Sequence, residues 1–223
     1  MATRLYFTQS AFIEFSPTYD AGWTDTSEAS RYQLANTKAA SAIAAGTRVG
    51  PMSGTAGEKW LDRQYVSSPL AIGLTVSGTF KGQLMAREYN NGDDVNQIIT
   101  KIWLCDSTGG LRGVLFAIAS AGPTAEFISN ASHRNKTIAD GDALLPIVAL
   151  AGDRLVVEIG ASNSGAATTP EFSFKWGEAA SDLPEDETQT TDGAGWIELS
   201  PDLTFVSASG GAPNALMLVG CGV

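Results

Sequence analysis

Hydrophobic and polar residues alternate with a period of two along most of the ordered-looking parts of this sequence, which predicts strands rather than helices. In residues 97–105 apolar side chains fall on both faces, so we expect a strand inside a packed sandwich. A glycine-containing turn at residues 106–110 separates it from a second apolar run at residues 111–118. Strand, glycine-rich turn and strand are typical of a β-hairpin.

Similar patterns predict further strands at residues 5–7, 12–15, 63–66, 74–88, 125–128, 144–150, 155–160, 171–176, 196–199 and 215–219. Helical signals are few. Residues 27–34 predict a short helical turn with Ser27 as its N-cap. The alanine-rich residues 39–45 fit a helix or an extended segment equally well.

Many short strands separated by turns favour a mainly β fold, a single antiparallel β-sandwich of the jelly-roll kind. We expect residues 61–223 to form this sandwich. Residues 1–60 are interpreted as an extended N-terminal arm and a long loop, because their apolar side chains are too few to form a core of their own. Such an arm, with Leu5, Phe7, Phe12 and Phe15 spaced along it, would pair with a neighbouring subunit or wrap its own sheet.

The net charge of the chain limits the classes of partner that it is expected to bind. The chain has 14 Lys and Arg against 24 Asp and Glu, a net charge of −10. An acidic surface repels phosphate backbones and anionic lipids, so we expect no nucleic-acid and no membrane partner. The N-terminus resembles no secretory signal, and no apolar run approaches the roughly 18–20 residues that span a bilayer.

Residue types that support catalysis are scarce. His133 is the only histidine and lies in a polar, basic stretch, so we expect a solvated side chain and no catalytic triad. Cys105 and Cys221 belong to no metal-binding spacing and are expected to be small buried hydrophobes. Glu158 is the best single candidate for an acid in a glycoside hydrolase, but alternation places it on the outer face of its strand, without an evident partner. We therefore expect no enzyme, no metal and no cofactor.

The most distinctive local composition is an acidic segment at residues 181–192, which contains five carboxylates and one proline. Oxygen ligands at this density fit a calcium site, but the spacing of an EF-hand loop is missing. A solvated loop is the favoured interpretation, and docking to a basic patch on a partner is a third.

The chain has five tryptophans, which raise the possibility of stacking against sugars. Trp103, Trp176 and Trp196 lie in strand patterns and are expected to pack in the core. Trp23 and Trp60 lie in loop-like surroundings and are the better candidates for an intersubunit or ligand contact.

Several segments together resemble a family of tailed-bacteriophage virion proteins. They include the opening Arg4-Leu5-Tyr6-Phe7, residues 16–23, 63–70, 112–115 and 152–160, and the acidic segment with Trp196-Ile197-Glu198. The matches span most of the chain, and none is a catalytic motif. The resemblance implies a small β-sandwich that is a structural component of the virion.

The function we expect is a capsid decoration or cement protein, a homo-oligomer, with a trimer favoured, that binds other virion proteins and above all the major capsid protein. The alternative is a tail or tail-tip component that binds a receptor or a glycan. The residues expected at its interfaces are Leu5, Tyr6, Phe7, Phe12, Phe15, Trp23, Trp60, Asp182, Glu185, Asp186 and Glu187.

Overall fold

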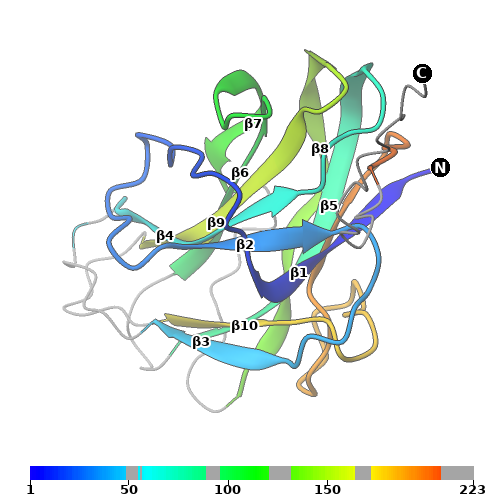
Figure 1. Ribbon diagram of the computed structural model, residues 1–223. Helices are drawn as coiled ribbons and strands as arrows, with labels where there is room; N and C mark the ends of the chain where they lie inside the picture. The colour runs from blue at the N-terminus through cyan, green and yellow to red at the C-terminus, as the bar shows by residue number, and fades with distance from the viewer. Residues whose placement is uncertain (49–54, 56, 89–95, 121–131, 164–171, 207–223) are drawn as a thin grey trace, which may run out of the picture.

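The computed structural model describes residues 1–48, 55, 57–88, 96–120, 132–163 and 172–206 of the chain. In these residues the fold is all β, which confirms the mainly β prediction (Figure 1). The strands are β1 (Thr3–Ala11), β2 (Ser30–Ala35), β3 (Ala44–Arg48), β4 (Lys59–Ser67), β5 (Leu74–Glu88), β6 (Asn96–Cys105), β7 (Leu111–Ala119), β8 (Arg134–Ala149), β9 (Arg154–Asn163), β10 (Phe172–Trp176) and β11 (Trp196–Leu199).

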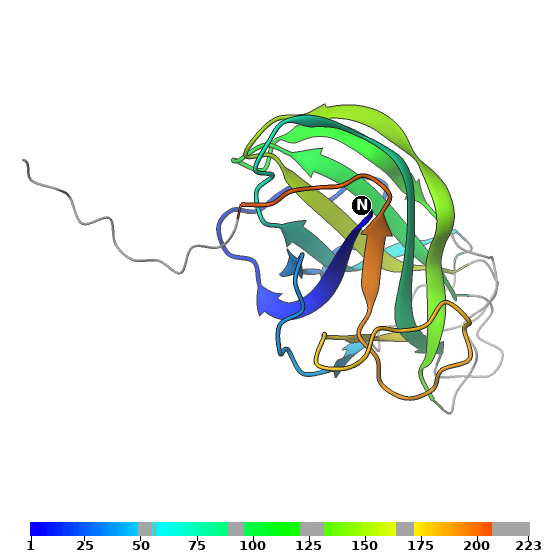
Figure 2. The ribbon, with the colours of Figure 1, turned by 90° about the vertical axis from the view of Figure 1, so that its right-hand side faces the viewer.

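The strands form one 11-stranded sheet in the order β3-β10-β5-β11-β1-β2-β4-β9-β6-β7, with β8 paired to β5 off this path. Every pair is antiparallel except β2 with β4, which run parallel, so the sheet is mixed rather than purely antiparallel. The long strands β5 and β8 curve around one side of the molecule, so the sheet folds back over its own inner face (Figure 2). This curvature is what lets a single sheet enclose a core.

The core lies between the facing halves of the sheet. Phe7 and Tyr65 have ring centroids 5.0 Å apart, and Tyr65 and Trp176 have theirs 5.3 Å apart. The aromatic group continues into apolar side chains of the other strands, such as Phe80 and Val157, which are fully buried. Trp176 and Trp196 are buried as expected.

A second layer covers the outer face of β4, β6 and β9. It is formed by the loop at residues 12–29, which follows β1. Phe12 packs there with Trp103 and Val156, and Trp23 packs with Leu61 and Ile99. The outer face of these strands therefore also buries apolar side chains, which explains why residues 97–105 carry apolar groups on both faces.

The strand predictions agree with the structure at most sites within the described residues. The bounds of β5 match the prediction of residues 74–88, while β8 begins ten residues before the predicted 144–150. Two predictions are wrong: residues 12–15 form a loop, and residues 27–34 contain β2 instead of a helical turn. Of the two alternatives for residues 39–45, the structure shows the extended one, which runs into β3. The predicted strands at 125–128 and 215–219 lie outside the described residues.

The interpretation of residues 1–60 as an arm is also corrected. β1 lies between β11 and β2, and it pairs with both. Its inward side chains Leu5 and Phe7 have no solvent exposure. The strands β1, β2 and β3 of this segment are thus part of the sheet, and the alternate apolar residues of β1 pack in a core with strands far away in sequence.

Candidate functional site

The aromatic residues expected at an interface lie mostly inside the chain. Phe12, Trp23 and Trp60 are 5%, 6% and 9% exposed, and Leu5 and Phe7 are fully buried. Tyr6 and Phe15 are half-buried. A side chain covered by its own chain offers no surface to a partner, so these residues are a core and a cover for the sheet rather than an exposed interface.

The acidic segment is a largely exposed loop, as expected, and several of its carboxylates also bind cations of the sheet. Asp182 accepts a 2.9 Å hydrogen bond from Arg4 Nη1 and a 2.5 Å bond from Lys38 Nζ. Burial alone would raise the pKa of Asp182, but the hydrogen bonds from Lys38 and Arg4 bring it below its ordinary value. The Arg4 guanidinium also lies 3.9 Å above the ring of Trp196.

Other carboxylates of this segment also accept hydrogen bonds from residues of the sheet. Glu187 accepts bonds from Lys136 Nζ at 3.1 Å and from the backbone N–H of Thr137 at 2.8 Å. Glu185 accepts a 2.7 Å bond from Lys81. Asp186 accepts a bond from the N–H of Thr188 in its own loop and pairs with the side chain of Asn135 on β8. In the described residues no three His, Cys, Asp or Glu side chains come together as a metal site. The segment joins β1, β5 and β8.

Glu158 lies on the outer face of β9, as alternation predicted, but the loop at residues 12–29 buries it completely. Its carboxylate accepts hydrogen bonds from Trp23 Nε1 at 2.7 Å and Gln64 Nε2 at 2.9 Å. Burial raises the pKa of Glu158, and the bonds from Trp23 and Gln64 oppose this rise. Nearby, Lys101 is paired with Asp20 of the same loop.

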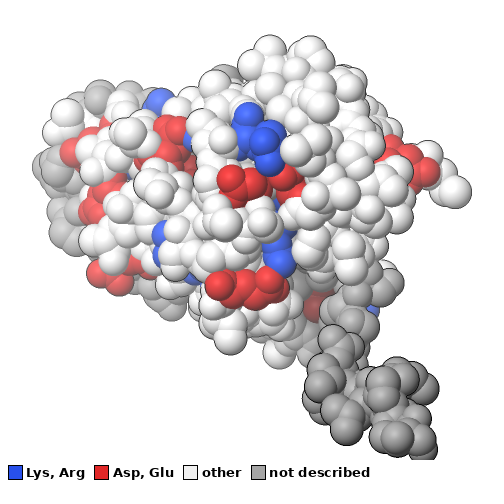
Figure 3. Space-filling view, turned by 45° about the horizontal axis from the view of Figure 1, so that its top comes forward, with Lys and Arg blue, Asp and Glu red and all other residues white. Residues whose placement is uncertain are grey.

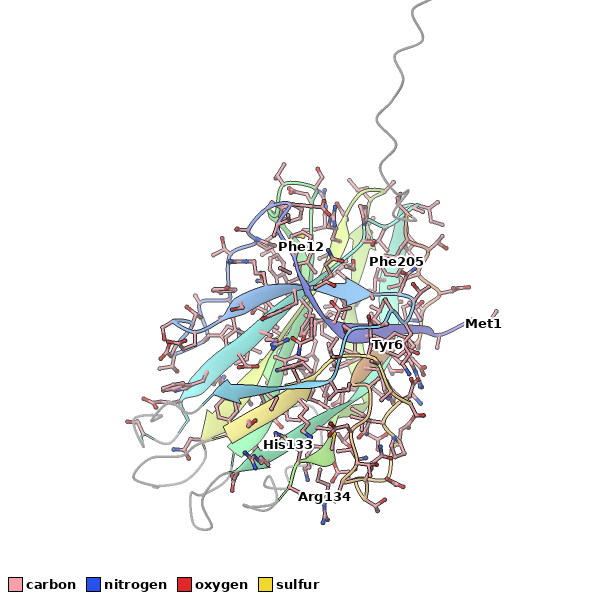
Figure 4. All side chains as sticks on the ribbon, turned by 60° about the horizontal axis from the view of Figure 1, so that its bottom comes forward. Met1, Tyr6, Phe12, His133, Arg134 and Phe205 are labelled. Carbon is pink, nitrogen blue, oxygen red and sulfur yellow. The ribbon has the colours of Figure 1, made fainter. Side chains whose placement is uncertain are left out.

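His133 is buried, 6% exposed, which corrects the expectation of a solvated side chain. Its Nε2 lies 2.9 Å from Ser173 Oγ on β10. Burial lowers the pKa of His133 to about 4, and the positive charges of Arg87 and Lys175 add to the shift. In the view of Figure 4 His133 lies at the opposite end from Phe12, the first residue of the loop that follows β1.

An exposed apolar surface lies at the end of the molecule where β8 turns into β9. Six large side chains define this end surface, and they are 49–64% exposed: Ile72, Leu111, Leu145, Val148, Leu150 and Val206. Figure 3 brings this end forward and shows broad areas without charged side chains between the acidic and basic groups.

Backbone contacts bring the segments of the end surface together. In the β8–β9 turn Leu150 N–H donates to Asp153 Oδ2, and the same carboxylate binds Arg112 beside Leu111. The N–H of Gly152 donates to the carbonyl of Leu70, two residues before Ile72. Gly152 has a φ of 91°, which favours glycine at this tight turn.

A polar hollow of about 520 Å³ lies beside the start of β9. Arg154 is the one cationic side chain that the described residues contribute to its lining, and it is in direct contact with Glu14. Uncharged polar side chains complete the lining, namely Gln33, Asn36, Thr37, Ser67 and Ser68, with Phe12 and Val66 as apolar neighbours. No sequence pattern predicts this hollow, because its residues come from four separate segments and follow no motif.

No family model matches this chain, and no curated protein matches it. Among solved structures it is similar to a CocE/NonD family hydrolase from Staphylococcus aureus, in two structures at 11% and 12% identity and TM-scores of 0.45 and 0.41, over 90% and 89% of this chain. It is also similar to an aminopeptidase from a marine sediment archaeon, Thaumarchaeota archaeon, at 12% identity and a TM-score of 0.37, over 90% of this chain. The chain spans 36–37% of the length of these structures. No helix of the described residues is long and apolar enough to cross a membrane.

Proposed function

We propose that this chain is a structural protein of a bacteriophage particle, a decoration or cement protein that stabilises the head. The observation that carries the proposal is the end surface, where six apolar side chains stand exposed on a chain with a net charge of −10. Apolar patches of this kind mark sites where proteins associate. The resemblance of the sequence to tailed-phage virion proteins is the reason for proposing a phage particle as the place where this surface binds.

In this proposal the end surface docks on the major capsid protein. The body of the protein is acidic, which keeps many free copies soluble and apart before assembly. Burial of the apolar side chains of the end surface against the shell would then provide the binding free energy, at about 25 cal/mol for each Å² of apolar surface removed from water. We propose a homo-oligomer, a trimer, arranged about the local symmetry axes of the head and resident in the virion.

The test uses purified protein and empty expanded heads of the phage that encodes it. The protein should bind the heads at a fixed number of copies and raise their melting temperature. A double variant, Val148→Asp with Leu150→Asp, should lose binding, while Thr190→Asp on the acidic segment at the far end of the molecule should bind as before. Wild-type protein that leaves head stability unchanged would contradict the proposal.

A tail or tail-tip component that binds a glycan is the second candidate. The observation in its favour is the polar hollow beside Arg154, whose volume of about 520 Å³ lies in the range of small-molecule sites. For this function the protein should label tails rather than heads and should adsorb to host cells.

A further inference from the structure

The guanidinium of Arg154 is a buried charge that its own chain satisfies only in part. The side chain is 9% exposed. Its Nη1 donates a 3.0 Å hydrogen bond to the carbonyl of Ser67, and its Nη2 binds the carboxylate of Glu14. Its Nε is buried and has no hydrogen-bond partner among the described residues.

The counter-charge is the weak element of this arrangement. The Glu14 side chain is 57% exposed and lies on the loop after β1, so it is in contact with solvent as well as with Arg154. The other neighbouring carboxylate, Asp153, is held by two bonds from Arg112. A buried guanidinium is stabilised best by a carboxylate that accepts two parallel N–H bonds, and here the Nε donor of that pair is open.

The residues that line the hollow indicate what kind of ligand would carry such a carboxylate. Gln33, Asn36, Thr37 and Ser68 offer uncharged donors and acceptors, and all four retain solvent exposure. Among the described residues of the lining Arg154 is the one cation, which matches one negative charge rather than the two of a phosphate monoester. The hollow is also larger than a simple carboxylate needs.

We propose that this hollow binds a sugar residue that carries a carboxylate, of the uronic acid type. The carboxylate takes the place of Glu14 and accepts bonds from Nε and Nη2 of Arg154. The sugar hydroxyls pair with the amide and hydroxyl side chains at the rim. This inference does not depend on where the protein sits on a particle.

The probe for the test is glucuronate, titrated into the full chain and followed by the NMR signal of the Arg154 Nε–H group. Glucuronate should bind saturably and shift this signal, and glucose, which lacks the carboxylate, should not. Acetate should bind at least about tenfold more weakly, since it makes no contact with the rim. Equal binding of glucose and glucuronate, or no binding, would overturn the proposal.

Variants test the roles of the two charged residues. Glu14→Gln removes the competing carboxylate, so glucuronate should bind about tenfold more tightly. Glu28→Gln removes one negative charge from another exposed position, and its affinity should stay at the wild-type value. Arg154→Lys keeps the charge but not the paired N–H groups, and it should weaken binding by about tenfold or more. If this variant does not fold, Glu14→Gln still decides, because an unchanged affinity there contradicts displacement of Glu14.

Discussion

The indole N–H of Trp23 donates a 2.7 Å hydrogen bond to Oε2 of Glu158, and so joins the loop after β1 to the middle of β9. Gln64 on β4 binds the other carboxylate oxygen at 2.9 Å. The three side chains are buried, so the loop is held over the sheet by a polar contact inside an apolar layer. This explains how a sheet with two apolar faces keeps one of them covered.

Trp23→Phe removes this donor and retains most of the apolar contact. We expect a loss of about 2 kcal/mol in the free energy of unfolding, because a hydrogen bond to a buried charged group is removed. Urea denaturation measures it. The control is Tyr19→Phe in the same loop, which loses a 3.1 Å bond to the neutral carbonyl of Ala29 and should cost about 1 kcal/mol. Equal losses would contradict a special role for the bond to Glu158.

His133 gives the protein a pH dependence. Its pKa in the folded chain, about 4, lies below the ordinary 6.5, so the neutral ring stabilises the fold above pH 6.5. This contribution, at most about 3 kcal/mol, is lost as the pH falls from 6.5 towards 4. His133→Gln should flatten that part of the stability curve, measured by urea denaturation across this range. Curves of the same slope for both proteins would contradict the account.

The sequence predicted the strands well wherever apolar residues alternate, as in β5 and β9. It did not predict that β8 starts at Arg134, because polar side chains such as Asn135 and Lys136 are typical of a loop. They are buried here since they bind the acidic segment, with Lys136 on Glu187 and the Asn135 amide on the carbonyl of Pro184. Two polar segments about fifty residues apart satisfy each other, and no local pattern shows this.

The candidate sites were harder to predict for the same reason. Trp23 and Trp60 have loop-like neighbours, yet Trp23 is buried where the loop folds back on the sheet, and Trp60 lies on β4 in the main core. The end surface and the Arg154 hollow are each assembled from several separate segments. Only the folded chain brings them together.

The acidic segment should contribute to stability through Asp182. Asp182→Ala removes the partner of Arg4 and Lys38 and should cost about 1–3 kcal/mol, because two half-buried cations lose a counter-charge. Since the pKa of Asp182 is lowered by these partners, its contribution is present above the ordinary pKa and is lost as the pH falls below it. Thermal or urea unfolding measures both effects.

The matched control for this substitution is Asp186→Ala. Asp186 is exposed, and its hydrogen bonds are with neutral groups, the N–H of Thr188 and the side chain of Asn135, so its removal should change stability by less than about 0.5 kcal/mol. If the two variants were equally stable, the segment would not tie the strands together.

Charges placed on the end surface should separate docking from folding. Val148→Asp with Leu150→Asp should leave the unfolding free energy within about 1 kcal/mol of the wild type, because both side chains are at least half exposed. Binding to expanded heads should nevertheless fall by about a hundredfold or more. Sedimentation provides the second readout: a change in oligomeric state with head binding intact would assign the surface to contacts between copies and contradict docking on the shell.

The most direct test of a role in the particle is electron microscopy of intact phage labelled with antibodies against this chain. The account predicts label distributed over the surface of the heads, at the local symmetry axes. Label confined to tails would contradict the decoration role and favour the glycan-binding alternative, and particles without label would contradict a structural role in the virion altogether.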